Sequence, residues 1–284
     1  MLAQFIYCYV LRPWPLREIT NYIIKKIIPE KIKSNKSIIY LNPNDPVISG
    51  ALFFGVYEKS ETKFLNNICL EGMKVIDIGA NVGYYSALTS DAVGPKGIVI
   101  AIEPDPESFK YLLKTIQASK FKNIRPFLKA ASDHNNILPL FISKDNRGDN
   151  RLYKTNQKRS YVNVETIRLD ELIIENEIDQ IDLIKIDVQG YEPKVIRGMQ
   201  KIITSSKKIL LLTEFWPKGI IDAGENPYDF LEMLRNFDFL LYELNKKGKL
   251  VLLRKEDDAK LIYKYRGRKY TNLVGKKNMI NKLN

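Results

Sequence analysis

One stretch constrains the fold of this 284-residue chain more than any other: KVIDIGANVGYYSALTSDAVGPKGIVIAIEPDPESF, from Lys74 to Phe109. Its pattern indicates an apolar strand, a turn containing Gly79 and Gly83, a helix, and a second apolar strand that leads into Glu103. This order of elements is typical of a nucleotide-binding crevice at the edge of a parallel sheet. The sequence therefore raises the question of which nucleotide-like ligand the crevice would hold.

Strand-like and helix-like segments alternate from Lys74 onward. The predicted strands are apolar and rich in β-branched residues: Val75–Ile78, Ile98–Ile102, Ile124–Leu128, Ile181–Ile186 and Ile209–Thr213. The predicted helices lie between or after them: Tyr84–Ala92, Pro106–Ser119, Leu169–Glu175, Pro193–Thr204 and Pro227–Asn236. Two last strands, Phe239–Leu244 and Leu250–Leu253, flank the turn sequence NKKGK. The expected fold is α/β, a doubly wound, mostly parallel sheet that ends in an antiparallel hairpin.

Composition and charge divide the chain into three parts. We expect an N-terminal extension at residues 1–70, helical and irregular, then a sheet domain at 71–254 and a basic tail at 255–284. The net charge is +12, and residues 245–284 hold thirteen Lys or Arg against three Asp or Glu. Such a tail can contact nucleic acid, anionic lipid or an anionic carrier, or simply keep the protein soluble.

Several classes of protein are disfavoured by the residue content. The two cysteines, Cys8 and Cys69, cannot form a disulfide framework, and the chain is expected in a reducing, cytoplasmic location. With His134 as the single histidine, no metal site and no Ser-His-Asp triad are predicted. The apolar run Leu2–Leu11 is too short to span a membrane. It would pack on the domain or touch the inner membrane face peripherally.

The turn GANVG, residues 79–83, differs from the loops that bind pyrophosphates. It lacks the central glycine and the spacing of G-x-G-x-x-G, and the chain has no G-x-x-x-x-G-K-[ST] motif. Asp77, just before the turn, would repel a phosphate but suits a cation. Glu103 can accept hydrogen bonds from two vicinal ribose hydroxyls. These features favour S-adenosylmethionine, which has an amino-acid end, a sulfonium, a ribose and an adenine, over a plain tight turn.

Five separated motifs, VIDIGANVGYYS, AIEPDPESFKYL, AASD, ETIRLDELI and IDLIKIDVQGYEPKVIRGM, occur in this order. Together they resemble the FkbM family of S-adenosylmethionine-dependent methyltransferases, over roughly residues 70–253. The resemblance implies a Rossmann-like class I methyltransferase fold and, mostly, O-methylation of hydroxyls on sugars or natural products. By the same resemblance, the cofactor-binding residues are Asp77, Gly79, Ala80, Asn81 and Gly83 at the methionine end, Glu103 at the ribose, and Pro104, Asp105, Ser132 and Asp133 near the adenine.

A hydroxyl is a weak nucleophile, so a base that takes its proton assists methyl transfer. The resemblance implies that Asp187, at the end of a buried strand, faces the reaction centre. Glu214, at the end of the next strand, and Glu192, at the start of a helix, are further candidate catalytic residues. Glu192 could instead only favour the helix N-terminus, and Lys185 could be an ion-pair partner.

The loop NRGDNRLY, residues 146–153, is the predicted acceptor site. Asp149 could bind sugar hydroxyls, while Arg147 and Arg151 could bind a carboxylate or a phosphate. The alternative is a solvated turn. Trp216 could form an apolar wall against a sugar face or belong to the core.

The sequence therefore predicts a methyltransferase that acts on a hydroxyl of a sugar, glycolipid or natural product, with a small molecule or glycan as acceptor. The positive charge leaves two alternatives open, a nucleic-acid methyltransferase and a protein that binds nucleic acid or a membrane through its tail. Against nucleic acid, the chain lacks the N/D-P-P-Y/F motif of amino-methylating enzymes and a Pro-Cys pair for cytosine chemistry. No oligomeric state is predicted.

Overall fold

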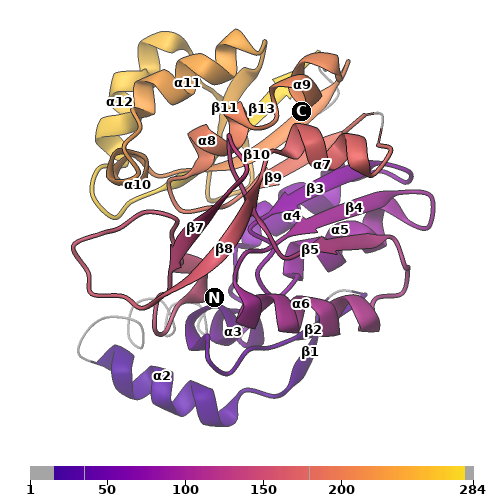
Figure 1. Cartoon of the computed structure of the whole chain (residues 1–284), viewed down its shortest axis with the longest axis vertical. Coiled ribbons are helices and arrows are strands. Elements are labelled where there is room, and N and C mark those ends of the chain that lie inside the picture. Colours follow the sequence, from indigo (N-terminus) through magenta and orange to yellow (C-terminus); the bar gives the residue numbers. More distant parts are fainter. Residues whose placement is uncertain (1–15, 35, 179, 279–284) are drawn as a thin grey trace.

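The computed structural model describes residues 16–34, 36–178 and 180–278 (Figure 1). Its main sheet has eight strands in the order β12-β11-β13-β10-β9-β3-β4-β5. The parallel strands are β3 (Lys74–Ile78), β4 (Ile98–Ile102), β5 (Ile124–Phe127), β9 (Leu183–Ile186) and β10 (Ile209–Phe215). The antiparallel strands are β11 (Leu240–Leu244), β12 (Leu250–Leu252) and β13 (Thr271–Lys277). This confirms the predicted doubly wound sheet and its antiparallel hairpin.

The strand order reverses at β3, which pairs in parallel with β4 on one side and β9 on the other. In such sheets, ligands bind beyond the carboxyl ends of the strands at the reversal. The residues that follow β3, β4 and β9 therefore meet at one edge.

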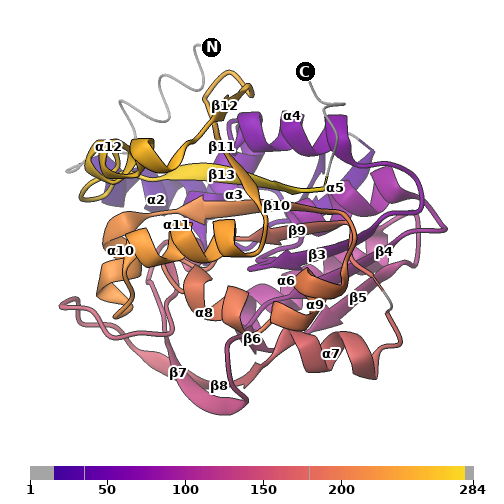
Figure 2. The ribbon, with the colours of Figure 1, turned by 90° about the horizontal axis from the view of Figure 1, so that it is seen from above.

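Helices cover both faces of this sheet (Figure 2). One face carries α4 (Lys59–Ile68), α5 (Tyr84–Val93) and α6 (Pro106–Ala118). The other carries α7 (Leu169–Glu175), α8 (Glu192–Arg197), α9 (Gln200–Ser205), α10 (Pro217–Asp222) and α11 (Pro227–Asn236). Side chains point to alternate faces along each strand. Val75 therefore packs in the hydrophobic core under α4, α5 and α6, while Ile76 and Ile78 pack in the core on the opposite face.

The predicted helix at 193–204 is two helices, α8 and α9, separated near Gly198. A Cβ atom at Gly198 would lie 1.9 Å from the Ser132 carbonyl oxygen, so the chain turns where it passes close to another backbone. The sequence contains a glycine at this point, but nothing local to it indicates that contact.

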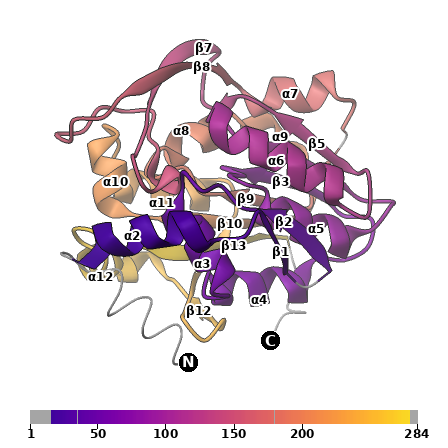
Figure 3. The same cartoon turned by 90° about the horizontal axis from the view of Figure 1, so that it is seen from below.

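The N-terminal extension packs beneath the sheet domain (Figure 3). It consists of α2 (Leu16–Ile27), the hairpin β1 (Lys31–Ser34) and β2 (Ser37–Tyr40), and α3 (Pro46–Phe53), followed by α4. The Tyr40 backbone N–H donates to Thr115 on α6, and Ser37 donates to Asp91 on α5. Buried Ile39 joins the same core. The extension is thus attached to the domain through specific contacts.

The apolar run Leu2–Leu11 lies outside the described residues. Among the residues that are described, no helix combines the length and the apolar character needed to cross a membrane.

A second small sheet interrupts the alternation of strands and helices between β5 and α7. It contains β6 (Ala130–Ala131), β7 (Asn136–Phe141) and β8 (Tyr161–Ile167), with β7 and β8 antiparallel. The loop between β7 and β8 includes a short 3₁₀ turn, η2 (Arg147–Asp149). This loop reaches the carboxyl edge of the main sheet, as the residues of the cavity there show.

The segment predicted to be a basic tail differs from that expectation over residues 255–277. It forms η3 (Lys255–Asp257), α12 (Asp258–Lys264) and β13, and β13 is inserted between β10 and β11. Leu273 and Val274 are fully buried there, and the Lys277 ammonium donates to the Ile203 carbonyl. This strand is not predicted when the segment is judged by its charge, because the two lysines of β13 follow an apolar stretch.

The insertion of β13 can be tested by its contribution to stability. Leu273 is 0 % exposed, so Leu273→Ala should lower the free energy of unfolding by about 2–5 kcal/mol. Leu252, 42 % exposed on β12, provides the control, and Leu252→Ala should cost less than about 1 kcal/mol. Urea denaturation of both variants checks this, and equal stabilities would contradict a buried β13.

Candidate active site

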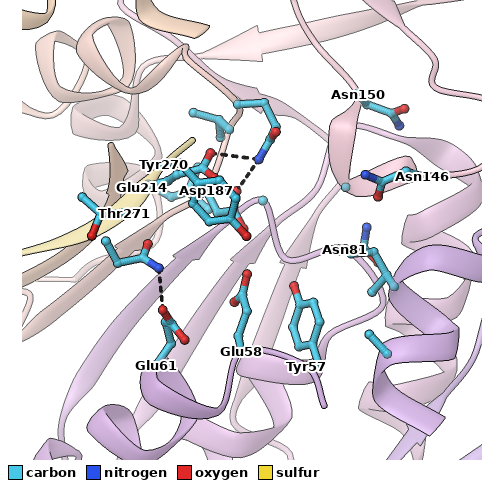
Figure 4. Close-up of a pocket in the computed structure, with 18 of the residues that line it drawn as sticks. Tyr57, Glu58, Glu61, Asn81, Asn146, Asn150, Asp187, Glu214, Tyr270 and Thr271 are labelled. Carbon is cyan, nitrogen blue, oxygen red and sulfur yellow. Dashed lines mark hydrogen bonds between the residues drawn. The ribbon is translucent and has the colours of Figure 1, made fainter. Parts of the chain in front are cut away.

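A cavity of about 1240 Å³ lies at the carboxyl ends of β3, β4, β9 and β10 (Figure 4). Asn81, Asn146 and Asn150 stand on one side of the view, and Asp187, Glu214, Tyr270 and Thr271 gather on the other. Glu58 and Tyr57 point into the space between. The volume exceeds the roughly 300–1000 Å³ of a usual small-molecule pocket, so two ligands could lie in it side by side.

The turn at residues 79–83 forms the wall of one end of the cavity. Gly79 has φ +80°, and a Cβ atom there would lie 2.0 Å from the carbonyl oxygen of Asp187. Asn81 also has a positive φ, and Gly83 packs closely on Leu112 of α6. Ala80 is buried and donates its N–H to the Ile102 carbonyl, so it supports the turn from behind. The glycines are therefore required by close contacts as well as by backbone conformation.

Glu103 lines the same end and is fixed by backbone donors. Its two carboxyl oxygens accept from the N–H groups of Asn81 and Asp105, both at 2.8 Å. Burial raises the pKa of Glu103 to about 8, although these two hydrogen bonds oppose the shift. Pro104 lines the cavity beside it. Lone pairs remain on the Glu103 oxygens for hydroxyl donors.

Asp77 lies beneath the turn and is 1 % exposed. Its Oδ2 accepts from the Ser86 hydroxyl at 2.6 Å, while its Oδ1 is buried without a hydrogen-bond partner. The Lys185 ammonium is 3.6 Å from this Oδ1. A buried carboxylate oxygen that lacks a donor usually indicates a missing partner.

Four charged or polar side chains form a cluster at the ends of β9 and β10. The Lys185 ammonium lies 3.8 Å from Asp187 Oδ2, and the Gln189 amide donates to both Asp187 (3.0 Å) and Glu214 (2.9 Å). Burial tends to lower the pKa of Lys185, but the surrounding carboxylates, first Asp77 and then Asp187, raise it above its usual value. Burial, followed by repulsion from Asp187, raises the pKa of Glu214 well above its usual range.

Glu192, a predicted catalytic residue, does not line the cavity. It is fully buried, and its Oε1 accepts from the backbone N–H groups of Val188 and Gly190 at 3.2 Å. It therefore holds the loop after Asp187 in shape. The helix N-terminus places its carboxylate against backbone donors rather than toward the cavity.

Ser132 and Asp133, predicted near the adenine, also lie away from the cavity lining. Ser132 is 0 % exposed, and Asp133 pairs with Arg197 and with His134, which is exposed. The neighbouring Ala131, one position earlier at the end of β6, lines the cavity instead. Asp105, predicted near them, is buried and caps α6.

Three of the four residues predicted to bind the acceptor are not brought into the cavity, whereas the fourth, Arg147, does line it. Asp149 is paired with Arg151 and Arg159, and the Arg151 guanidinium lies 4.7 Å from the centre of the Trp216 ring. The Trp216 indole donates to the Gly267 carbonyl at 2.7 Å, and the side chain is buried. This network stabilises the loop from behind, so the alternative of a structural role describes these residues better.

Their neighbours in the same loop do face the cavity. Asn146, Arg147 and Asn150 line it on the side of Asn81, and Arg147 and Asn150 both donate to Asp105 Oδ2, at 2.6 and 3.2 Å. Asn146 Oδ1 is buried without a hydrogen-bond partner. The loop was predicted to bind the acceptor, but it stands at the end formed by the glycine turn.

Sequence reasoning missed the contribution of the N-terminal extension. Glu58 precedes α4 with a left-handed φ of 31°, and Tyr85 donates its hydroxyl to the Glu58 carboxylate at 2.7 Å. Burial, and then repulsion from Asp187, raises the pKa of Glu58 to about 8. A strained backbone that aims a carboxylate into a cavity is typical of functional sites. No motif around Glu58 could have indicated this position.

The C-terminal segment completes the far end. Tyr270 and Thr271, at the start of β13, line the cavity, and Asn272 donates its side-chain amide to Glu61 Oε1 on α4 at 2.7 Å. The N-terminal extension and the segment predicted to be a basic tail thus meet at the end of the cavity opposite the glycine turn.

The raised pKa values predict a pH-dependent stability. Glu58 keeps its proton in the folded protein up to a pKa of about 8 but loses it near 4.5 when unfolded, so its contribution is full below pH 4.5 and is lost as the pH approaches 8. Relative to Glu58→Gln, the wild type should therefore lose unfolding free energy from about pH 5 to 8, by up to about 1.4 kcal/mol per pH unit. Urea denaturation across this range measures the difference. The exposed-site variant Glu256→Gln should follow the wild type, and parallel curves for Glu58→Gln would contradict the shift.

Known proteins resemble this chain in sequence. Residues 77–249 match the family model of methyltransferase FkbM domains. The chain is 26 % identical over 186 residues to the hexuronic acid methyltransferase AglP of Haloferax volcanii, covering 64 % of this chain and 70 % of that protein. It is 28 % identical over 187 residues to the 2-O-methyltransferase NoeI of Sinorhizobium fredii, covering 58 % and 72 %. The crystal structure of the methyltransferase FkbM from Methylobacillus flagellatus aligns with a TM-score of 0.46 and 14 % identity, over 92 % of this chain and 60 % of that one.

The family match runs from Asp77, before the glycine turn, to the turn between β11 and β12, and spans more than half of the chain. It includes the strands whose ends form the cavity. The predicted family, enzyme class and cofactor are confirmed: the chain belongs to the FkbM family of S-adenosylmethionine-dependent methyltransferases.

Proposed function

We propose that this methyltransferase transfers a methyl group to a hydroxyl of a sugar or of a related acceptor rich in hydroxyls. The observation that carries the proposal is the position of Asp187, a carboxylate that faces the cavity and contacts the glycine turn through its backbone. Two relatives, a hexuronic acid methyltransferase and a 2-O-methyltransferase, support an oxygen acceptor.

The end of the cavity near Gly79 suits S-adenosylmethionine. The turn lets the cofactor approach the backbone closely, and Asp77 beneath it, although paired with Lys185 and outside the cavity lining, adds negative charge that favours the ammonium of the amino-acid end. Glu103 has lone pairs left for the two ribose hydroxyls. The unpartnered Oδ1 of Asn146 suits the exocyclic amine of adenine. We therefore assign the adenine to the loop at 146–150 rather than to Ser132 and Asp133.

S-adenosylmethionine supplies a methyl group that its sulfonium activates toward attack by an oxygen. The task left to the chain is to orient the acceptor hydroxyl and to take its proton. Asp187 is the carboxylate we assign to the proton, at an oxygen facing the cavity. Burial and repulsion from Asp187 raise the pKa of Glu214, which favours its protonated form, and Gln189 holds the two carboxyl groups in fixed positions. Glu58 lies opposite, where it can hydrogen-bond a second hydroxyl.

Removal of the proposed base should affect turnover more than cofactor binding. Asp187→Asn keeps the shape of the side chain, and we expect methyl transfer to fall about 10²- to 10⁴-fold. The measurement uses radiolabelled S-adenosylmethionine with a panel of methyl glycosides and uronic acids. S-adenosylhomocysteine should still bind to this variant. Asp229→Asn, at an exposed position on α11, is the control, and full activity of Asp187→Asn would refute this role.

The cofactor assignment is tested separately by isothermal titration with S-adenosylhomocysteine. Glu103→Ala removes both ribose acceptors and should weaken binding by roughly tenfold or more, since a buried hydroxyl left without its hydrogen-bond partner costs about 1–3 kcal/mol. Glu107→Ala, four residues further on in α6 and outside the cavity lining, should bind as the wild type does. Wild-type affinity in Glu103→Ala would exclude a ribose contact.

A further inference from the structure

The outer part of the cavity is lined by three bases that form no ion pair within the described parts of the chain. Lys246, in the turn between β11 and β12, and Arg268 and Lys269, in the loop between α12 and β13, all line the cavity. We call these three residues the basic rim. Their side chains are exposed. Across residues 16–34, 36–178 and 180–278, none of the three forms an ion pair or a hydrogen bond through its side chain.

Three other bases in or beside these segments do have an intramolecular partner. Lys264 pairs with Glu243 at 2.7 Å, Lys255 pairs with Glu232, and the Arg266 guanidinium lies 4.1 Å from the centre of the Tyr263 ring. The bases with an intramolecular partner are thus distinct from the basic rim. Three unpaired cations from two separate loops converge on one cavity, although mutual repulsion opposes this arrangement.

The inner wall has the opposite character. Glu58, Asp187 and Glu214 face the cavity there, and these carboxyl groups suit hydrogen bonds with hydroxyls. An acceptor between the inner wall and the basic rim would meet hydrogen-bonding groups at one end and cations at the other. Such a gradient orients a molecule that carries hydroxyls and one anionic group.

We propose that the acceptor carries an anionic group, a carboxylate or a phosphate, which the basic rim binds while the hydroxyl to be methylated faces Asp187. This inference rests on the proposed function and adds the charge of the acceptor. Arg268 can bind either anion through two parallel N–H donors, and the two lysines contribute charge. The anionic group fixes which end of the acceptor enters first, so it would also decide which hydroxyl reaches the cofactor end.

The test compares two triple variants that lose the same charge. Lys246→Ala/Arg268→Ala/Lys269→Ala removes the basic rim. Lys247→Ala/Lys249→Ala/Arg266→Ala removes three exposed bases from the same two loops, at positions that do not line the cavity. Lys59, an exposed base that also lines the cavity from α4, stays in both. Thermal unfolding and S-adenosylhomocysteine binding should be equal in the two, which shows that both are folded.

Three probes are titrated into each protein saturated with S-adenosylhomocysteine, with binding followed by ligand-observed NMR. They are methyl β-D-glucuronide, glucose 1-phosphate and the neutral methyl β-D-glucoside. We expect the wild type and the control triple to bind an anionic probe at least roughly tenfold more tightly than the neutral one, and the rim triple to lose this preference. Whichever anionic probe binds more tightly distinguishes a carboxylate from a phosphate.

Two results would overturn the inference. One is a wild type that shows no preference for either anion over the neutral glycoside. The other is a control triple that loses the preference as fully as the rim triple, because only the overall charge would then matter. Failure of the proposed function has a different signature, which is unchanged methyl transfer in Asp187→Asn or no binding of S-adenosylhomocysteine.

Discussion

The contact between the Gly79 turn and the backbone of Asp187 is the constraint on which the rest of the site depends. β3 lies between β4 and β9, and the Asp187 N–H donates to the Ile78 carbonyl just before the turn. Only a hydrogen at the Gly79 Cα fits against the Asp187 carbonyl. The backbone proposed to hold the cofactor and the backbone that carries the proposed base are therefore in van der Waals contact. Their separation is set by the sheet rather than by flexible side chains.

The site also depends on the electrostatic balance between Lys185 and the carboxyl groups around it. Strand register places Lys185 directly opposite Asp77, so one ammonium is buried among carboxyl groups from β3, β9, β10 and the start of α4. A single cation cannot neutralise all of them, and burial of further charge would cost several kcal/mol. Burial and mutual repulsion instead raise the pKa values of Glu58 and Glu214, which favours their protonated forms.

The sequence predicted those features that depend on residues close together in the chain. The β-branched strands, the glycine turn and Glu103 each follow from a few adjacent residues, and their predicted bounds differ little from those observed. Contacts between distant segments could not be predicted. Gln189 bridges two strand ends, and Asn272 reaches Glu61 across 211 positions. Asp149, Arg151 and Trp216 had suitable chemistry for an acceptor, but they satisfy each other, which only the folded chain reveals.

The insertion of β13 between β10 and β11 has a consequence for the order in which a growing chain can fold. All five parallel strands are synthesised by residue 215, whereas β10 and the β11–β12 hairpin stay unpaired along one edge until residue 277 has left the ribosome. Unpaired strand edges are sites of aggregation, so this interval is the vulnerable stage of biosynthesis. The loop that supplies Tyr270 and most of the basic rim is also made last. A nascent protein could therefore form the pocket proposed for its cofactor before the groups proposed to bind the anionic end of its acceptor have been made.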